Sequence, residues 1–96
     1  MTPTAFRRTL SLAAPPAALA PPLAALWWAG RGDWDKAHRL VMDEAGREAA
    51  WVHAYMRRVK GDTGNANYWY AQARRQPAQG DLDAEWEMIV AALLRR

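Results

Sequence analysis

The clearest indication of the fold is the stretch Gly61-Asp62-Thr63-Gly64-Asn65-Ala66-Asn67-Tyr68-Trp69-Tyr70-Ala71-Gln72-Ala73-Arg74. It opens with a Gly-Asp turn, and the Thr63 hydroxyl that follows can cap a helix. Small and large apolar side chains then recur at the i, i+3, i+4, i+7 spacing of one helical face, at Ala66, Trp69, Tyr70 and Ala73. Because this face alternates small and large residues, we expect it to pack against another helix.

The same pattern occurs upstream, in the stretch Gly32-Asp33-Trp34-Asp35-Lys36-Ala37. Gly32 and Gly61 are 29 residues apart, so the chain contains two similar helix-turn-helix units. The fold class that we predict is all-α, with two antiparallel helical hairpins and a capping C-terminal helix.

The limits of five helices follow from caps, glycines and apolar spacing. The first begins at residue 21 or 22 and ends at residue 30 or 32, and the second begins at Asp33 and ends at Gly46. The third covers about 48–60 and the fourth is the stretch quoted above. The fifth is capped by Asp81 or Asp83. Its predicted buried stripe is Leu82, Trp86, Ile89, Val90 and Leu93.

Residues 1–20 differ in composition from the rest, because prolines interrupt a run of alanines. Each proline ring removes a backbone donor and clashes with the preceding turn. We therefore predict a disordered Ala/Pro-rich tail at 1–20 and a single helical domain at 21–96. The alternative is an export signal, with Arg7 and Arg8 before an apolar run and Ala18-Leu19-Ala20 as a cleavage site. That apolar run is short, which favours a cytoplasmic protein.

Composition narrows the possible functions. The 96 residues have no cysteine, which excludes disulfides, thiolate chemistry and cysteine-based zinc sites. The only serine is Ser11, in the tail, and no phosphate-binding or catalytic motif is present. We therefore expect a protein that is not an enzyme and has no cofactor. The net charge of +3 keeps nucleic acid as an unlikely partner, and no segment approaches the roughly 20 apolar residues of a membrane span.

The turn residues and the alanines around them resemble a tetratricopeptide repeat, in which alanine lets the second helix approach closely. The matching positions are Gly32, Asp33, Trp34 and Ala37 in the first unit and Gly61, Asp62 and Ala66 in the second. The segment 66–73 also resembles the second helix of Sel1-like repeats, and the whole is similar to a small uncharacterised bacterial helical family. Thr63 replaces the usual aromatic residue. The resemblance implies a concave face that binds a peptide or protein.

Six polar and aromatic residues form the predicted partner-binding site, with two arginines as rim charges that attract an acidic partner. The six are Trp34, His38, His53, Asn65, Tyr68 and Gln72, and the rim charges are Arg57 and Arg58. Histidines on neighbouring helices could flank a groove, or each could simply be a partly buried side chain with a hydrogen-bond partner. They lack a third metal ligand at helical spacing, so no metal site is expected. Tyr68 could also pack against the fifth helix.

The function that we predict is a non-enzymatic protein- or peptide-binding scaffold or adaptor that uses a helical-repeat groove between the first units. One alternative is a small-molecule sensor whose pocket is lined by Trp34 and Trp51, and the other is a basic nucleic-acid accessory protein. Trp27 and Trp28 are adjacent, so both cannot lie on one buried stripe. One of them should be exposed or at an interface, which favours a partner or a homodimer.

Overall fold

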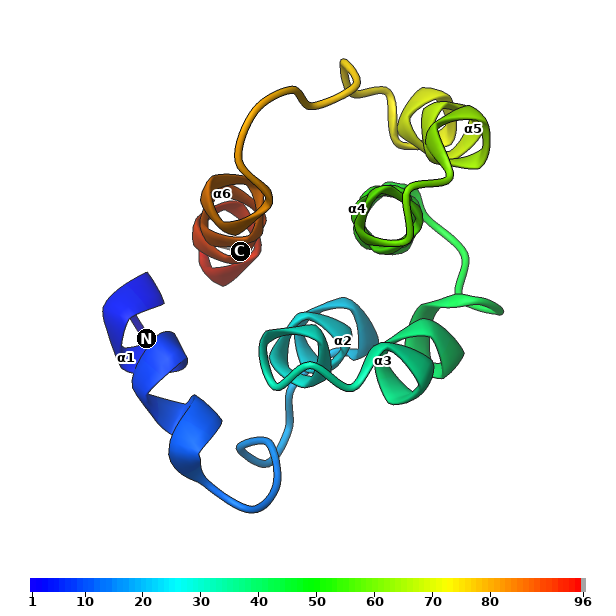
Figure 1. Cartoon of the computed structure of the whole chain (residues 1–96). Helices are drawn as coiled ribbons and strands as arrows, with labels where there is room; N and C mark the ends of the chain where they lie inside the picture. The colour runs from blue at the N-terminus through cyan, green and yellow to red at the C-terminus, as the bar shows by residue number, and fades with distance from the viewer. Residues whose placement is uncertain (96) are drawn as a thin grey trace.

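The structure, a computed structural model, describes residues 1–95, so Arg96 of the predicted domain lies outside it. The described chain is all-α, as predicted, and contains no strand (Figure 1). Its elements are α1 (Pro3–Arg8), a 3-10 helix (Thr9–Ser11), α2 (Pro21–Gly30), α3 (Trp34–Val41), α4 (Arg47–Val59), α5 (Thr63–Ala73) and α6 (Leu82–Leu94). Among the described residues, no helix is long and apolar enough to cross a membrane.

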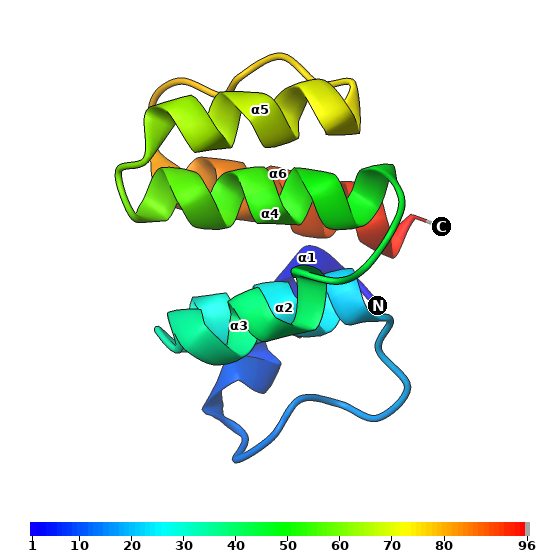
Figure 2. The same cartoon turned by 90° about the vertical axis from the view of Figure 1, so that its right-hand side faces the viewer.

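Two helix pairs have turns of the same geometry. α2 packs on α3 and α4 packs on α5, and Figure 2 shows the second pair lying side by side. Each turn has a glycine at positive φ, 82° at Gly32 and 79° at Gly61. The next residue caps the following helix, because the carboxylates of Asp33 and Asp62 accept backbone N–H bonds at 3.1 and 3.2 Å. Thr63 is the first residue of α5, so its prediction as the cap is wrong.

The end of α3 also differs from the prediction. This helix stops at Val41, five residues before the glycine that was expected to terminate it. Gly46 instead lies directly before α4, with φ at 103°. A glycine marks a position with positive φ, but that position can precede a helix as well as follow one.

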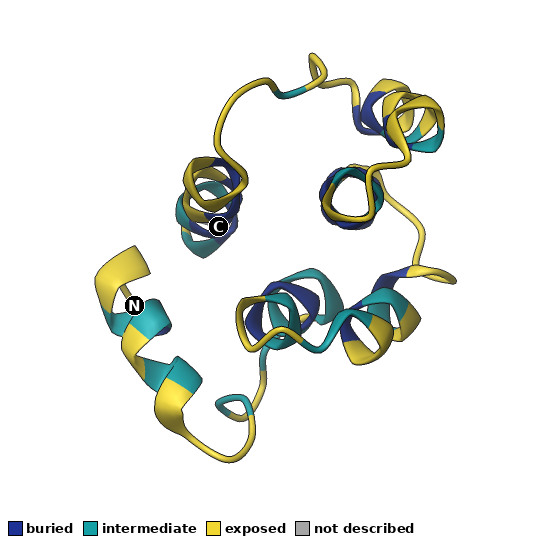
Figure 3. Cartoon of the chain, in the orientation of Figure 1, coloured by how far each residue is buried: buried dark blue, intermediate teal, exposed yellow. Residues whose placement is uncertain are grey.

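α6 covers the inner faces of both hairpins. It packs against α4, α2 and α1, and the Trp86 indole N–H donates to the carbonyl oxygen of Leu26 at 2.8 Å. Figure 3 shows the buried positions of α2, α4 and α6 turned toward the interior. Four of the five predicted stripe residues are buried, whereas Leu82 is 36% exposed. This helix thus contacts both hairpins, through α2 of the first and α4 of the second.

Pro3–Arg8 and Thr9–Ser11 are helical, so the expectation that prolines exclude a helix there is wrong. Pro3 stands in the first turn of α1, where its missing N–H has no intrahelical partner to lose. Phe6 is fully buried, with its ring centroid 5.9 Å from that of Trp86. The Trp27 indole N–H donates to the Thr9 hydroxyl at 3.0 Å. The segment expected to be a mobile tail thus contributes to the core.

The adjacent residues Trp27 and Trp28 point to different sides of α2, as helical spacing requires, and they differ in burial. Trp27 is fully buried, and Trp28 is half-buried with the Lys36 ammonium group 4.2 Å from its ring centroid. Trp28 is therefore the member of the pair at the surface.

A buried carboxylate joins α6 to the second hairpin. Glu85 is only 3% exposed, and its Oε1 accepts a hydrogen bond from Arg58 of α4 at 2.9 Å. Its Oε2 accepts from the Tyr70 hydroxyl of α5, and Arg58 also donates to the Gly80 carbonyl. Burial and this carboxylate raise the pKa of Tyr70, and burial raises the pKa of Tyr55 nearby to about 12. Arg58 therefore holds an internal ion pair and is not a rim charge.

Replacing Phe6 by alanine should lower the free energy of unfolding by about 3–5 kcal/mol, because a buried aromatic ring leaves a cavity. Thr4→Ala, at an exposed position of the same helix, is the matched control and should change little. Urea denaturation followed by circular dichroism measures both. Equal stability of the two variants would show that α1 does not pack on the core.

Removing Arg58 leaves the Glu85 carboxylate buried without its cation, so Arg58→Ala should cost about 3–5 kcal/mol of unfolding free energy. Arg39→Ala removes an exposed arginine of α3 and should stay within about 0.5 kcal/mol of the parent protein. The same denaturation experiment compares them, and a small effect of Arg58→Ala would contradict a structural role for the ion pair.

Candidate functional site

Five rings form a continuous row across α3, α4 and α5, which we call the aromatic row: Trp34, His38, His53, Trp69 and Tyr68. Trp34 stacks on His38 with centroids 4.6 Å apart, and His53 stacks on Trp69 at 4.1 Å. The two histidines meet edge to face at 4.9 Å, and Tyr68 meets Trp69 edge to face at 5.1 Å. Aromatic pairs prefer these two arrangements because ring faces are electron-rich and ring edges are positive.

Helical spacing explains how the row is assembled. Trp34 and His38 are four residues apart on α3, so their side chains lie one above the other. His53 lies on α4, which packs against both α3 and α5, and it bridges the two outer helices. Two of the four links, those on either side of His53, therefore depend on the packing of α4. The other two join residues that are close together in the chain.

The hydrogen bonds of the two histidines define their protonation. His38 Nε2 lies 3.2 Å from His53 Nε2 and 3.3 Å from the guanidinium Nη2 of Arg57. A guanidinium only donates, so His38 Nε2 accepts and its proton is on Nδ1. His53 then donates from Nε2. Its Nδ1 is buried without a hydrogen-bond partner. His38 is therefore neutral in this arrangement.

The pKa values of both histidines agree with neutral rings. Burial lowers the pKa of His53 to about 4, with further lowering by the neighbouring His38 and Arg57. Burial and the Arg57 charge also lower the pKa of His38, and Asp35 partly opposes this. Neither ring is expected to carry charge at neutral pH.

Two cations border the row at Trp34. The Arg57 guanidinium lies 5.6 Å from the Trp34 ring centroid, and the Lys60 ammonium lies 4.7 Å from it. The Trp34 indole N–H donates to the Met56 carbonyl oxygen at 2.8 Å, which fixes the ring against α4. This end of the row is therefore positively charged and held in one orientation.

Exposure is lowest at His53, in the middle of the row, and highest at Tyr68, the α5 end. His53 is 4% exposed, Trp34 and Trp69 are half-buried, and Tyr68 is 55% exposed. The alternative in which Tyr68 packs against the last helix is therefore wrong. The buried rings support a tyrosine that is free to contact a partner.

The structure brings together five of the eight predicted site residues, which are Trp34, His38, His53, Arg57 and Tyr68. Asn65 and Gln72 precede and follow Tyr68 by three and four residues, so they share its face of α5. Arg58 lies elsewhere, in the ion pair with Glu85. Trp69 and Lys60 were missed.

Trp69 was assigned only to the core stripe because its spacing matched buried positions. No signal in the sequence showed that its ring also meets a histidine from another helix. Trp34 and Trp51, the tryptophans of the predicted sensor pocket, border two different hollows, so they do not line one pocket. Within residues 1–95 no three histidine or acidic side chains gather as metal ligands. The two histidines bond each other, and His38 also accepts from Arg57.

The chain was compared with protein-family models, with curated proteins and with solved structures, and none of them matches. The architecture and the site therefore rest on the geometry described above.

The histidine pair makes folding stability depend on pH. The unfolded chain binds protons on His53 near pH 6.5, whereas the folded chain does so only near pH 4. The unfolded state therefore holds more protons in this window, and stability should fall as the pH drops from about 6.5 to about 4.

His53→Phe keeps a ring against Trp69 and removes the titration. Between pH 7 and pH 4.5 the parent protein should lose about 2 kcal/mol more unfolding free energy than this variant loses. Urea denaturation at both pH values measures the loss of unfolding free energy in each protein. Both proteins contain the same carboxylates, so the effect of carboxylate titration cancels when the two losses are subtracted. An equal loss in the two proteins would contradict the neutral buried state of His53.

Proposed function

We propose that this chain is a non-enzymatic scaffold or adaptor domain that acts in the cytoplasm and binds a partner protein through the aromatic row. The observation that carries the proposal is the unbroken series of ring contacts that ends at the exposed Tyr68. Tryptophan, tyrosine and arginine are the residue types that contribute most of the binding energy at protein interfaces. All three are present on this one face.

The row is also held in place before binding. Stacking fixes Trp34 on His38, and Trp69 on His53, and the indole of Trp34 is hydrogen-bonded to α4. A partner would therefore lose little side-chain freedom at these residues, and this loss is a main cost of association. The two hairpins with matching turns support a repeat of the tetratricopeptide kind, but with its inner face covered by α6 the outer face is the one that we assign to binding.

A second candidate is binding to single-stranded nucleic acid. The observation in its favour is that Arg57 and Lys60 lie over Trp34, which combines positive charge with a surface for base stacking. Such binding would weaken steeply with salt, whereas contacts through Tyr68 would not. The low density of cations along the rest of the row favours the protein partner.

Two exposed side chains of similar accessibility provide the test. Tyr68 is 55% exposed and Met88 on α6 is 54% exposed, so neither Tyr68→Ala nor Met88→Ala should disturb the core. A photo-reactive phenylalanine analogue placed at either position would capture the partner in cells, and mass spectrometry would identify it. We expect capture from position 68 only.

With the identified partner in purified form, Tyr68→Ala should raise the Kd at least tenfold, which is about 1.4 kcal/mol, and Met88→Ala should leave it unchanged. Isothermal titration calorimetry at two salt concentrations measures both variants. Equal capture from the two positions, or equal affinity of the two variants, would show that the row is not the binding surface.

A further inference from the structure

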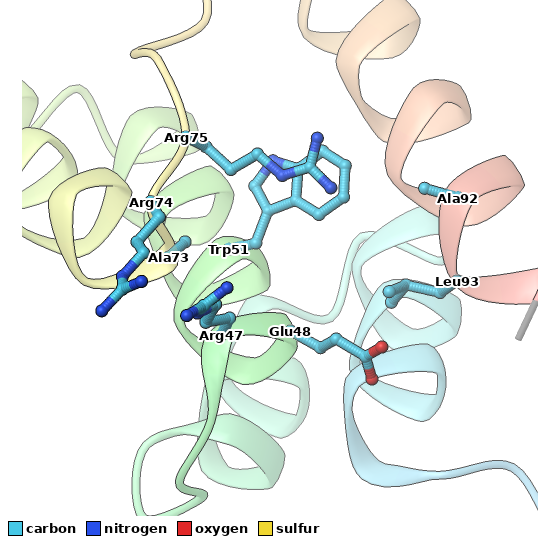
Figure 4. A pocket seen from close by; sticks show the side chains of 8 residues that line it. All are labelled: Arg47, Glu48, Trp51, Ala73, Arg74, Arg75, Ala92 and Leu93. Carbon is cyan, nitrogen blue, oxygen red and sulfur yellow. The ribbon is translucent and has the colours of Figure 1, made fainter.

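A hollow of about 350 Å³ lies between the start of α4, the end of α5 and α6 (Figure 4). Its lining combines three arginines, one glutamate and apolar side chains: Arg47, Glu48, Trp51, Ala73, Arg74, Arg75, Ala92 and Leu93. Figure 4 shows Arg47 and Arg74 on one side of the hollow and Ala92 and Leu93 across from them. None of these residues belongs to the aromatic row.

The hollow is lined by three arginines and only one acidic side chain, so positive charge is in excess. Between residues that the structure describes, the arginines that form ion pairs are Arg7 and Arg58. Arg47, Arg74 and Arg75 form no ion pair with a described residue. Three cations placed together repel one another, and an anion among them would offset that repulsion. Arginine suits this role because its planar fork matches a carboxylate with two hydrogen bonds.

Arg75 is held in a defined orientation. Its guanidinium carbon lies 3.7 Å from the ring centroid of Trp51, and Trp51 is only 5% exposed. Figure 4 shows the guanidinium group lying across the indole. Stacking on the ring face leaves the N–H groups at the edge of the guanidinium free to donate.

The backbone at Arg74 is a second, independent observation. The ends of α2 and α4 have glycine at positive φ, whereas α5 ends at Arg74 with φ at 57°. A residue with a Cβ atom is strained in this left-handed region, where glycine is not. Arg74 therefore holds a conformation that glycine would adopt without strain, and it is one of the residues that line the hollow.

The hollow continues along the end of the molecule into an apolar surface. It shares Arg47 and Glu48 with a hollow at the start of α4, and Glu48 and Leu93 with another that Leu19 and Leu23 line. The surface is thus cationic at one end and apolar at the other. A single small anion would fill only the first part, whereas an extended chain could follow the whole length.

We propose that this surface binds an acidic peptide segment of a partner protein, with carboxylates on Arg47, Arg74 and Arg75 and aliphatic side chains over Leu93. The site shares no residue with the aromatic row, so this proposal does not depend on the function proposed above. Exposed arginines position carboxylates and speed the approach of an acidic chain, and the apolar end adds contact area.

The test uses a short labelled peptide with glutamates at one end and leucines at the other. Fluorescence anisotropy measures its binding to the full chain. Arg74→Gln/Arg75→Gln should weaken its binding at least tenfold. Lys36→Gln/Arg39→Gln removes the same charge from exposed positions on α3 and should change the Kd less than twofold. Equal weakening by the two double variants would overturn the proposal, because it would reduce the effect to net charge.

Arg74→Gly separates binding from folding. Relief of the strained backbone should raise the Tm by roughly 2–5 °C, while loss of the guanidinium group should weaken peptide binding about fivefold. A variant that is more stable but binds as well as the parent protein would overturn the role of Arg74.

Two further ligands distinguish the kind of anion. A peptide with lysines in place of the glutamates should not bind. Inorganic phosphate and a single-stranded oligonucleotide are the competing ligands for the same arginines. If either binds through Arg74 and Arg75 more tightly than the acidic peptide does, the proposal is overturned in favour of a phosphate ligand.

Discussion

The carboxylate of Glu85 lies where α4, α5 and α6 meet, and the remaining packing depends on how this charge is accommodated. A buried ion is costly unless it is paired and hydrogen-bonded, and here Arg58 and Tyr70 each satisfy one of its oxygens. Because these partners come from two different helices, the charge can be buried only when α6 is correctly placed on the second hairpin. The ion pair therefore favours one arrangement of the helices over others.

That placement decides which surfaces remain open. With α6 over the inner faces of α2 and α4, eight consecutive residues of α4, from Ala49 to Met56, are buried. One side of this helix supplies the core and the other supplies His53 to the aromatic row. Exposed aromatic and cationic side chains then lie on the outer helices α3 and α5 and around the hollow at the start of α4 and the end of α5.

The two candidate surfaces differ in their physical chemistry. The aromatic row is built from stacked, uncharged rings whose position is set before any partner arrives, with cations only at the Trp34 end. The hollow beside Trp51 is strongly cationic and includes an arginine with a strained backbone. The aromatic row offers apolar contact area, whereas the hollow offers positive charge.

Features that depend on residues close together in the chain can be predicted from the amino-acid sequence. The two Gly-Asp turns, the helices that follow them and the buried stripe of α5 all arise from contacts within a few positions. Contacts between distant segments could not be predicted in this way. Long-range packing places Phe6 against Trp86, buries the Glu85 carboxylate at the acidic start of α6, and brings His38 next to His53. Periodicity shows which side of a helix is buried, but the partner on that side belongs to a distant segment and is selected by packing.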